Sequence, residues 1–285
     1  MPKRSKNKTF KVAFQGEIGA FSEEAAFKFF GSNVRTIPCQ TFSDVFRIVE
    51  RGAADFGILP IENSLEGTVG QNYEILLTSD VNIFGEEILR IRHCLIANKG
   101  VKIGSLKKVY SHPQALGQCR EFLEKLKLEM IPVYDTAGSV RVLKEERQKE
   151  AAAIASERAG KIYQMKILKK GIETNKQNFT RFFIIAKKEA KRVKNSKTSI
   201  VFSLKNIPGV LFKSLESFAK RKINLTKIES RPIMGKPWEY YFYLDFEGHR
   251  EAQKIKEALG DLKEKTLFIK ILGSYPAAKL QNGNK

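Results

Sequence analysis

The segment from Asp55 to Leu76 reads DFGILPIENSLEGTVGQNYEIL and contains one complete strand–loop–helix unit. An apolar run ends at Pro60, the polar residues 62–64 follow, and an amphipathic stretch begins after Gly67 and Thr68. Short apolar runs alternate with amphipathic stretches in the same way from Phe10 to Ala186. This alternation predicts an α/β fold with largely parallel sheets.

The pattern also predicts where the individual elements lie. The expected strands are Lys11–Gln15, Val34–Pro38, Phe56–Pro60, Asn82–Glu86, Lys108–Ser111, Met130–Tyr134, Ala152–Ala155 and Phe179–Ala186. The expected helices are Ser22–Phe30, Ser43–Arg51, Val69–Leu77, Pro113–Leu126, Ala137–Glu146 and Ser156–Tyr163. From its length alone, this region is one domain or two lobes.

A charged stretch from Lys187 to Lys197 then interrupts the alternation, and we interpret residues 188–197 as a linker. Residues 198–275 show a different order of elements. The expected order is Ser199–Leu204 (strand), Val210–Lys220 (helix), Leu225–Ile233 and Trp238–Phe246 (strands), Arg250–Leu259 (helix) and Thr266–Leu272 (strand). The order βαββαβ predicts a ferredoxin-like domain.

Composition narrows the class of protein further. The 285 residues are 42% hydrophobic, and no apolar run approaches the roughly 18 residues of a membrane span. Residues 1–8 are polar and basic, and no apolar run follows them as it would in a secretory signal. We therefore expect these residues to form a tail. Three cysteines and three histidines are scattered along the chain and predict neither a disulfide framework nor a metal site. A cytoplasmic protein is therefore expected.

The net charge of +20 permits nucleic-acid binding. Lysine and arginine are, however, spread along the whole chain, and no zinc-finger or RNP-type motif accompanies them. Such a charge also suits a protein that handles anionic metabolites. Nucleic-acid binding is therefore not the expected main function.

Polar residues gather where predicted strands end, which is where ligands of open α/β sheets bind. In the stretch GEIGAFSEE, Gly16 and Gly19 allow a tight loop, and Ser22 is expected to cap the next helix. The stretch lacks the third glycine of a dinucleotide fingerprint. It is therefore a candidate anion site or a capped turn.

Other strand ends carry uncharged hydrogen-bonding groups. Asn63 and Ser64 follow one strand, and Ser111 ends another, with Gln118 in the helix that follows it. Asp135 follows a third strand and is expected to cap the next helix. For each of these residues the alternative is a turn or helix cap without a ligand.

The stretch QNFTRFFII, residues 177–185, places Thr180 and Arg181 side by side at the start of an apolar strand. Side chains alternate along a strand, so these two point in opposite directions. Thr180 is suited to hydrogen-bond a leaving oxygen. Arg181 is suited to clamp a carboxylate of a ligand or of a loop.

Together these motifs resemble those of the prephenate dehydratase family, which the arogenate dehydratases share. GxxGAFSEEAA, LPIENSLEGTV, SHPQALGQC, DTAG, AAIASERAG and NFTRF occur in the order and at the spacing of that family. The resemblance implies a catalytic domain over residues 9–187 with two α/β lobes, like a periplasmic binding protein, and a site in the cleft. It implies the decarboxylating dehydration of prephenate to phenylpyruvate, without a cofactor or metal.

The resemblance also assigns roles to residues. It implies a catalytic set of Thr180, Asn63, Gln118 and Ser111. It implies a substrate-binding set of Glu62, Ser64, Ser22, Asp135, Arg181 and Phe182. No chorismate mutase segment precedes Phe10, so the monofunctional type is expected.

Residues 198–275 resemble the regulatory ACT domain, whose two phenylalanine-binding motifs are similar to NIPGVLFKSLESF and NLTKIESRP. The effector residues implied are Asn206, Pro208, Gly209, Val210, Leu211, Glu229, Ser230, Arg231 and Pro232. The resemblance implies a homodimer or homotetramer that L-phenylalanine inhibits. The alternative is a ferredoxin-like domain that only mediates oligomerisation.

The choice of substrate stays open at this point. Glu17 and Ala20 depart from the bacterial pattern, and Ala20 with the stretches NYEILL and HCLIA leans toward the plant-like branch, which often prefers arogenate. Outside this reaction class, a non-catalytic binding protein with an amino-acid-sensing domain is the main alternative. An exported binding protein would be expected to carry a signal peptide.

Overall fold

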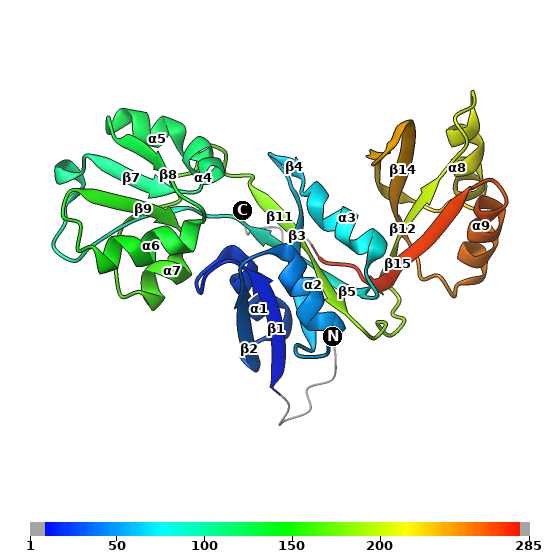
Figure 1. Cartoon of the computed structure of the whole chain (residues 1–285), viewed down its shortest axis with the longest axis horizontal. Coiled ribbons are helices and arrows are strands. Elements are labelled where there is room, and N and C mark those ends of the chain that lie inside the picture. Colours follow the sequence, from blue (N-terminus) through cyan, green and yellow to red (C-terminus); the bar gives the residue numbers. More distant parts are fainter. Residues whose placement is uncertain (1–8, 280–285) are drawn as a thin grey trace. The chain divides into compact units, whose positions relative to one another are not determined.

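The computed structural model describes residues 9–279, so the expected tail at residues 1–8 lies outside the described part. The described chain forms three β-sheets with helices packed on them (Figure 1). It divides into two compact units, which we call the first unit (residues 9–72 and 87–182) and the second unit (residues 73–86 and 183–279). The α/β fold with a following βαββαβ domain is confirmed.

The first sheet has the strand order β2-β1-β3-β11-β5, with β4 paired to β3. Its strands are β1 (Phe10–Gln15), β2 (Val34–Cys39), β3 (Phe56–Asn63), β4 (Gly67–Thr68), β5 (Asn82–Arg90) and β11 (Phe179–Ala186). The helices between them are α1 (Phe21–Phe30), α2 (Phe42–Glu50) and α3 (Gly70–Thr78). β1 pairs in parallel with β2 and β3, and its central residues 12–14 are fully buried, as the apolar run predicts.

The second sheet has the order β10-β6-β9-β7-β8. Its strands are β6 (Cys94–Ala97), β7 (Lys108–Ser111), β8 (Glu129–Pro132), β9 (Ala151–Ala155) and β10 (Lys166–Lys170). The helices of this region are the 3-10 turn η1 (Ile103–Ser105), α4 (Pro113–Gln118), α5 (Arg120–Lys125), α6 (Thr136–Glu145) and α7 (Glu157–Ile162). All five residues of β9 are buried, and α6 packs against this strand (Figure 1).

Three expectations about these elements were wrong. The second sheet is mixed and not largely parallel, because β6 pairs antiparallel with both β9 and β10, and the alternation had predicted neither β6 nor β10. The helix expected at Pro113–Leu126 is two helices that meet at Cys119, whose φ of −107° and ψ of 8° leave helical geometry. Ser22 does not cap α1, because the helix begins one residue earlier, with Ala20 at its N-cap.

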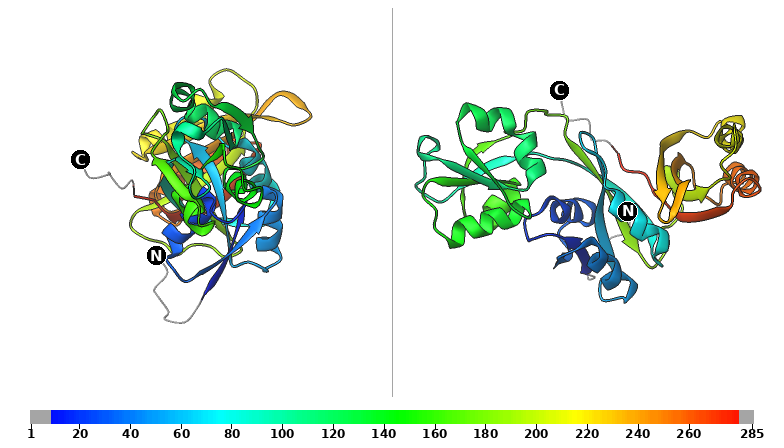
Figure 2. Two further views of the ribbon diagram at one scale, coloured as in Figure 1. Left: turned by 90° about the vertical axis from the view of Figure 1, so that its left-hand side faces the viewer. Right: turned by 45° about the horizontal axis from the view of Figure 1, so that its top comes forward.

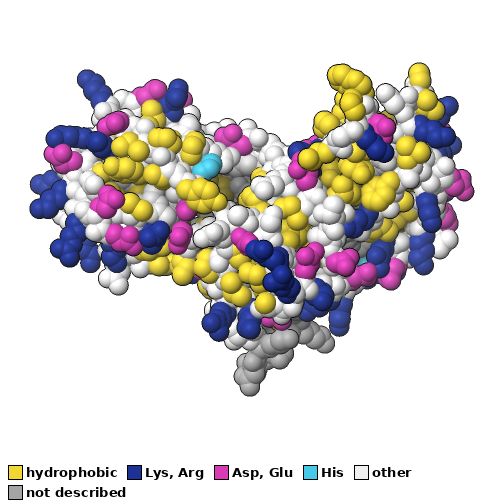
Figure 3. Space-filling model, viewed as in Figure 1, with side chains coloured by type: hydrophobic (Ala, Val, Ile, Leu, Met, Phe, Trp, Pro, Cys, Tyr) yellow, Lys and Arg dark blue, Asp and Glu magenta, His cyan; other side chains and the backbone are white. Residues whose placement is uncertain are grey.

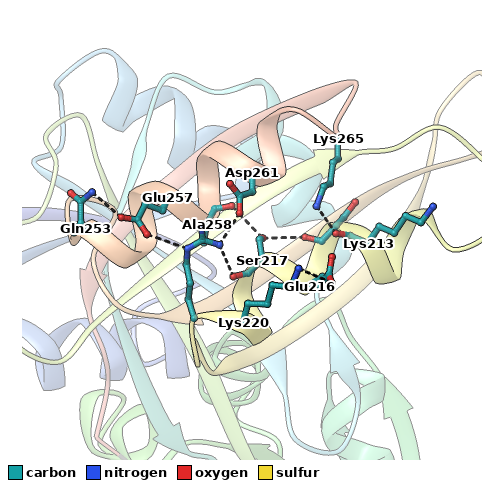
Figure 4. A network of polar contacts seen from close by, with 11 residues as sticks. Lys213, Glu216, Ser217, Lys220, Gln253, Glu257, Ala258, Asp261 and Lys265 are labelled. Atoms are coloured by element: carbon teal, nitrogen blue, oxygen red, sulfur yellow. Dashed lines mark hydrogen bonds and ion pairs between the residues drawn. The ribbon is translucent and has the colours of Figure 1, made fainter.

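The third sheet is antiparallel and has the order β13-β14-β12-β15. It contains β12 (Ser196–Ser203), β13 (Leu225–Ile233), β14 (Lys236–Glu247) and β15 (Phe268–Pro276), with α8 (Val210–Lys220) and α9 (Gln253–Lys263). Figure 2 shows the two helices side by side on one face of this sheet, where they enclose a core that includes Phe202, Phe218 and Phe246. Polar contacts also join the two helices: the guanidinium of Arg221, the C-cap residue of α8, lies 2.7 Å from Asp261, and the buried Ser217 Oγ donates to the Ala258 carbonyl (Figure 4).

The second unit also contains most of α3. Arg231 Nη2 lies 2.8 Å from Glu74 Oε1, and Tyr243 Oη donates to the Tyr73 carbonyl. Lys270 Nζ donates to the carbonyls of Leu76, Leu77 and Ser79 at the C-terminal end of the helix, where carbonyls have no partner within the helix backbone. The last two turns of α3 are therefore anchored to the third sheet.

Candidate active site

The end of β3 and the start of β11 lie beside each other and position the first two side chains of the candidate site. Ser64 fixes this junction, since its backbone N–H donates to the Phe179 carbonyl and its hydroxyl lies between the Gln177 carbonyl and the Phe179 N–H. Asn63, at the last position of β3, and Thr180, at the second position of β11, are both buried.

Asn63 connects to Thr180 directly. Its Nδ2 donates to Thr180 Oγ1 at 2.9 Å and to Asn178 Oδ1 at 2.8 Å. Its Oδ1 accepts from the backbone N–H groups of Leu65 and Glu66. Because a backbone N–H only donates, these two bonds fix the Asn63 side chain with its oxygen toward the loop and its nitrogen toward Thr180.

The remaining donors and acceptors follow from that orientation. Asn178 Oδ1 accepts from Asn63, so its Nδ2 is the group that donates to Gln118 Oε1 at 2.7 Å. The oxygen of Gln118 also lies 2.9 Å from His93 Nε2, and its Nε2 donates to Glu66 Oε1. We call the five side chains Thr180, Asn63, Asn178, Gln118 and His93 the amide network.

The amide network leaves the hydroxyl proton of Thr180 available. Thr180 Oγ1 is an acceptor toward Asn63, and no protein acceptor for its own proton is found within residues 9–279. A hydroxyl has one proton and two lone pairs, so this proton is free to donate to a ligand. The network thus presents a neutral, oriented donor.

Arg181, next to Thr180 in the chain, lies beside an acidic side chain. Its Nη1 is 3.8 Å from Glu62 Oε2, and only 11% of the Arg181 side chain is exposed. Glu62 belongs to β3, so this carboxylate is on a strand and not on a loop. Burial lowers the pKa of His93 below its ordinary value of 6.5, so this imidazole is neutral at pH 7.

Several residues expected at the site do not join the amide network. Ser111 is fully buried, and its Oγ donates to the Ile154 carbonyl within the second sheet. Phe182 is 1% exposed and lies in the core. Ser22 is buried in the first turn of α1.

Asp135 lies in a separate pocket. It caps α6 as expected, with its Oδ1 accepting from the Gly138 N–H. It lines this pocket together with Glu17, Tyr110 and Arg141, and none of the five residues of the amide network is part of the lining.

The glycine-rich loop after β1 is held from several sides, which the sequence pattern did not reveal. The buried Glu23 carboxylate accepts from the Gly19 N–H and lies 3.0 Å from the Arg158 guanidinium. Ser156 Oγ donates to the Gly19 carbonyl at 2.6 Å. Gly19 has a φ of +95° and faces Ala159 so closely that a Cβ would stand 2.8 Å from its Cα.

Gly19→Ala should therefore destabilise the protein by about 1–3 kcal/mol, because the methyl group meets backbone atoms that cannot yield. Thermal unfolding of the purified variant measures this loss. Gly31→Ala is the matched control, since Gly31 also has a positive φ but a Cβ there meets nothing within 4 Å. Equal destabilisation of the two variants would show that backbone conformation, and not the contact with Ala159, sets the requirement for glycine.

No group of three or more His, Cys, Asp or Glu side chains in the described part of the chain is arranged to hold a metal ion. The three cysteines are buried and free, and burial raises the pKa of Cys94 to about 11. Its thiolate, the reactive form, is therefore scarce at pH 7. Within the same residues, no helix is long and apolar enough to cross a membrane.

Fold and site together define an α/β domain with a neutral, hydrogen-bonding candidate site, joined to a βαββαβ domain. The sequence model of the prephenate dehydratase family matches residues 12–190, and that of the ACT domain matches residues 198–264. The chain belongs to the prephenate dehydratase family and carries an ACT domain.

Curated relatives match along most of the chain. A bifunctional chorismate mutase/prephenate dehydratase of Aquifex aeolicus is 45% identical over 280 residues, which are 97% of this chain and 76% of the relative. An arogenate dehydratase/prephenate dehydratase 2 of Arabidopsis thaliana, described as chloroplastic, is 47% identical over 277 residues, 93% of this chain and 72% of the relative. Relatives of both kinds are thus similar to this chain.

Solved structures match as well. A prephenate dehydratase from Arthrobacter aurescens in complex with L-Phe has a TM-score of 0.86 at 30% identity, over 93% of this chain and 89% of that one. GqqA, described as a novel type of quorum quenching acylase, has the same TM-score at 33% identity, over 94% of this chain and 98% of that one. The fold is therefore shared by proteins with different described activities.

Proposed function

We propose that this protein is a decarboxylating dehydratase that converts prephenate to phenylpyruvate, water and CO2. The observation that carries the proposal is the amide network, which holds Thr180 as an acceptor toward Asn63 and leaves its proton for a ligand. Thr180 and Asn63 belong to the motifs NFTRF and LPIENSLEGTV of the family to which the chain belongs.

The main requirement of the reaction is a hydrogen-bond donor for the leaving hydroxyl oxygen. The bond between the ring and its carboxylate breaks, the electron pair completes the aromatic ring, and the ring C–O bond breaks. The departing hydroxyl takes up one proton, which solvent supplies in net terms, and leaves as water. The Thr180 hydroxyl is a weak acid, so its role is to hydrogen-bond the oxygen as negative charge develops there.

The other residues of the expected sets serve the same reaction in this proposal. Gln118 binds substrate through its Nε2, which faces Glu66 at 3.3 Å. Ser64 and the Glu62–Arg181 pair hold the two strand ends in register. Ser22, Asp135 and Phe182 stay predicted substrate-binding residues, and Ser111 a predicted catalytic one.

Initial rates on prephenate and on arogenate, each with and without L-phenylalanine, test the proposal. We expect turnover of prephenate to phenylpyruvate. Faster turnover of arogenate would retain the site and change the substrate, an alternative that the arogenate dehydratases among the curated relatives support. If the folded protein turns over neither compound, the dehydratase proposal is wrong and a non-catalytic binding protein becomes the better hypothesis.

We further propose that L-phenylalanine binds the ACT domain and inhibits the enzyme. The similar structure from Arthrobacter aurescens is described as a complex with L-Phe, which supports this class of effector. In this chain Gly209 is the N-cap of α8 with a φ of +75°, so the first N–H groups of the helix follow a glycine turn. A helix start of this kind suits the effector carboxylate.

Regulation implies a subunit interface, and we propose a homodimer or homotetramer. Three large apolar side chains of the third-sheet region are more than 70% exposed: Phe212, Met234 and Trp238. In Figure 3 apolar side chains gather over the ends of α8 and β14, while lysine and arginine are interspersed with acidic side chains over the face shown. A second copy of the chain is the partner expected at the apolar surface.

We propose the cytoplasm as the location of the protein.

Gly209→Ala should raise the L-phenylalanine concentration for half-inhibition about fivefold. Alanine at a positive φ costs about 1 kcal/mol, and a Cβ at this position meets no neighbour, so the effect arises from the turn itself. Calorimetric titration with L-phenylalanine and inhibition curves measure the change. Lys220→Ala, at the other end of α8, is the control, and equal sensitivity of the two variants would place the effector elsewhere.

A further inference from the structure

His93 is the one titratable side chain of the amide network, and the stretch HCLIA that contains it did not indicate a role for it. It is 2% exposed and immediately precedes β6. Its backbone N–H donates to Glu173 Oε2, and its carbonyl accepts from the N–H groups of Gly171 and Ile172. The ring edge packs against Phe21 of α1 with 5.5 Å between ring centroids. The imidazole is therefore held in one place by both backbone and packing.

The hydrogen bonds of the amide network decide which ring nitrogen of His93 carries the proton. Gln118 Oε1 already accepts from Asn178 Nδ2, and an amide oxygen cannot donate. The contact of 2.9 Å between this oxygen and His93 Nε2 is therefore a hydrogen bond only when Nε2 is protonated. The other ring nitrogen, Nδ1, has no hydrogen-bond partner in the described part of the chain.

We propose that His93, as the neutral imidazole with its proton on Nε2, is the positioning residue that holds the Gln118 amide nitrogen on the side of Glu66, where one N–H meets the carboxylate and the other is left for the substrate. This role rests on the proposed dehydratase function. If Gln118 rotated by half a turn, its nitrogen would face Asn178 Nδ2, donor against donor. His93 Nε2 could then accept from that nitrogen only if the ring proton moved to Nδ1, which has no hydrogen-bond partner in the described part of the chain. His93 and Asn178 together exclude that rotamer, and Gln118 Nε2 stays on the side of Glu66.

The groups around His93 keep it neutral. Burial is the largest effect and lowers the pKa of the imidazole, while the hydrogen bond to Gln118 and the carboxylate of Glu173 raise it by less. Lys176 Nζ lies 3.9 Å from Glu173 Oε1 and offsets part of the carboxylate's charge. Phe21 contributes an apolar ring. Protonation of the neutral ring would add a proton at Nδ1, which has no acceptor. The charged form therefore carries the free-energy cost of a buried donor without a partner.

Two substitutions separate positioning from packing. His93→Leu fills much of the space without a donor, and we expect kcat to fall about tenfold with little change in KM, as for loss of one oriented hydrogen bond. His93→Gln carries an N–H group where Nε2 stands and should recover most of that loss. His249→Gln removes the other buried histidine, in the second unit, and serves as the matched control.

Two further measurements do not depend on turnover. In ¹⁵N-edited NMR spectra the His93 ring should show the Nε2–H tautomer at neutral pH, and it should take up a second proton at a lower pH than the ordinary value of 6.5. The lowered pKa also means that the unfolded state takes up the proton first. The contribution of neutral His93 to stability is thus present above pH 6.5 and is lost as pH falls toward the lowered pKa, so the stability advantage of wild type over His93→Gln should shrink on acidification.

The outcomes are distinct for the two proposals. An Nδ1–H tautomer, titration of His93 at its ordinary pKa, or wild-type kcat in a folded His93→Leu protein would each overturn the positioning role. If wild-type protein turned over neither prephenate nor arogenate, the dehydratase proposal would fall. The NMR spectra would then still decide the state of His93.

Discussion

Replacing Thr180 by alanine should lower kcat by about 10²-fold or more. The hydroxyl is the donor that the amide network leaves free, and loss of one preorganised donor at a developing negative charge has an effect of this size. KM should change much less, because the leaving oxygen of the bound substrate carries little charge. Steady-state rates on the better of the two substrates measure both parameters.

Thr180→Ser is the matched control for that substitution. Serine keeps Oγ and its proton, so it should retain most of the activity, with some loss because the methyl group no longer fixes the rotamer. Both variants should fold, since Asn63 Nδ2 keeps its second acceptor on Asn178. Near-normal turnover in a folded Thr180→Ala protein would remove Thr180 from the mechanism.

Asn63→Asp should also reduce kcat by at least about 10²-fold, through a reversal of hydrogen-bond direction. One carboxylate oxygen would still accept from the N–H groups of Leu65 and Glu66. The other would face Asn178 Oδ1 and Thr180 Oγ1, and the Thr180 proton would turn toward it and away from the substrate. The change replaces one atom and alters the shape of the site very little.

The pH dependence of Asn63→Asp distinguishes this account from simple damage to the fold. A protonated carboxyl group donates again, so part of the activity should return as pH falls through the raised pKa of the buried acid. The free energy of unfolding should also fall at neutral pH, because a buried charge without a partner is destabilising. A variant as active as wild type at neutral pH would show that the Asn63 side chain does not set the direction of the Thr180 hydroxyl.

The elements of the fold were predicted best where a single chain segment carries the whole signal. The bounds expected for α8 and β13 match the structure, because an amphipathic helix and an alternating strand are visible within one stretch. β6 and β10 were missed because each is short: β6 has four residues, and β10 is a mostly exposed strand of five residues that includes three lysines. The pairing that made the second sheet mixed lies between segments far apart in the chain.

The residues of the candidate site likewise divide into those that the sequence predicted and those that only the structure revealed. Thr180, Asn63 and Gln118 were expected from strand ends and motifs, and the structure brings them into one network. Asn178 stands two residues before Thr180 in the same motif, and that position was the available signal. His93 and Glu66 stand in the quoted stretches HCLIA and LPIENSLEGTV but were given no role, because their roles consist of contacts with Gln118 from separate segments.

The sequence by itself determined most of the strands and helices and the family to which the chain belongs, because hydrophobic periodicity and motif order are properties of the linear chain. Tertiary structure alone decided which polar atoms meet. Asn63 and Thr180 are separated by 117 positions, and Gln118 and His93 by 25. Hydrogen-bond direction depends on every partner at once, so the free proton of Thr180 and the tautomer of His93 exist only once the sheets have assembled.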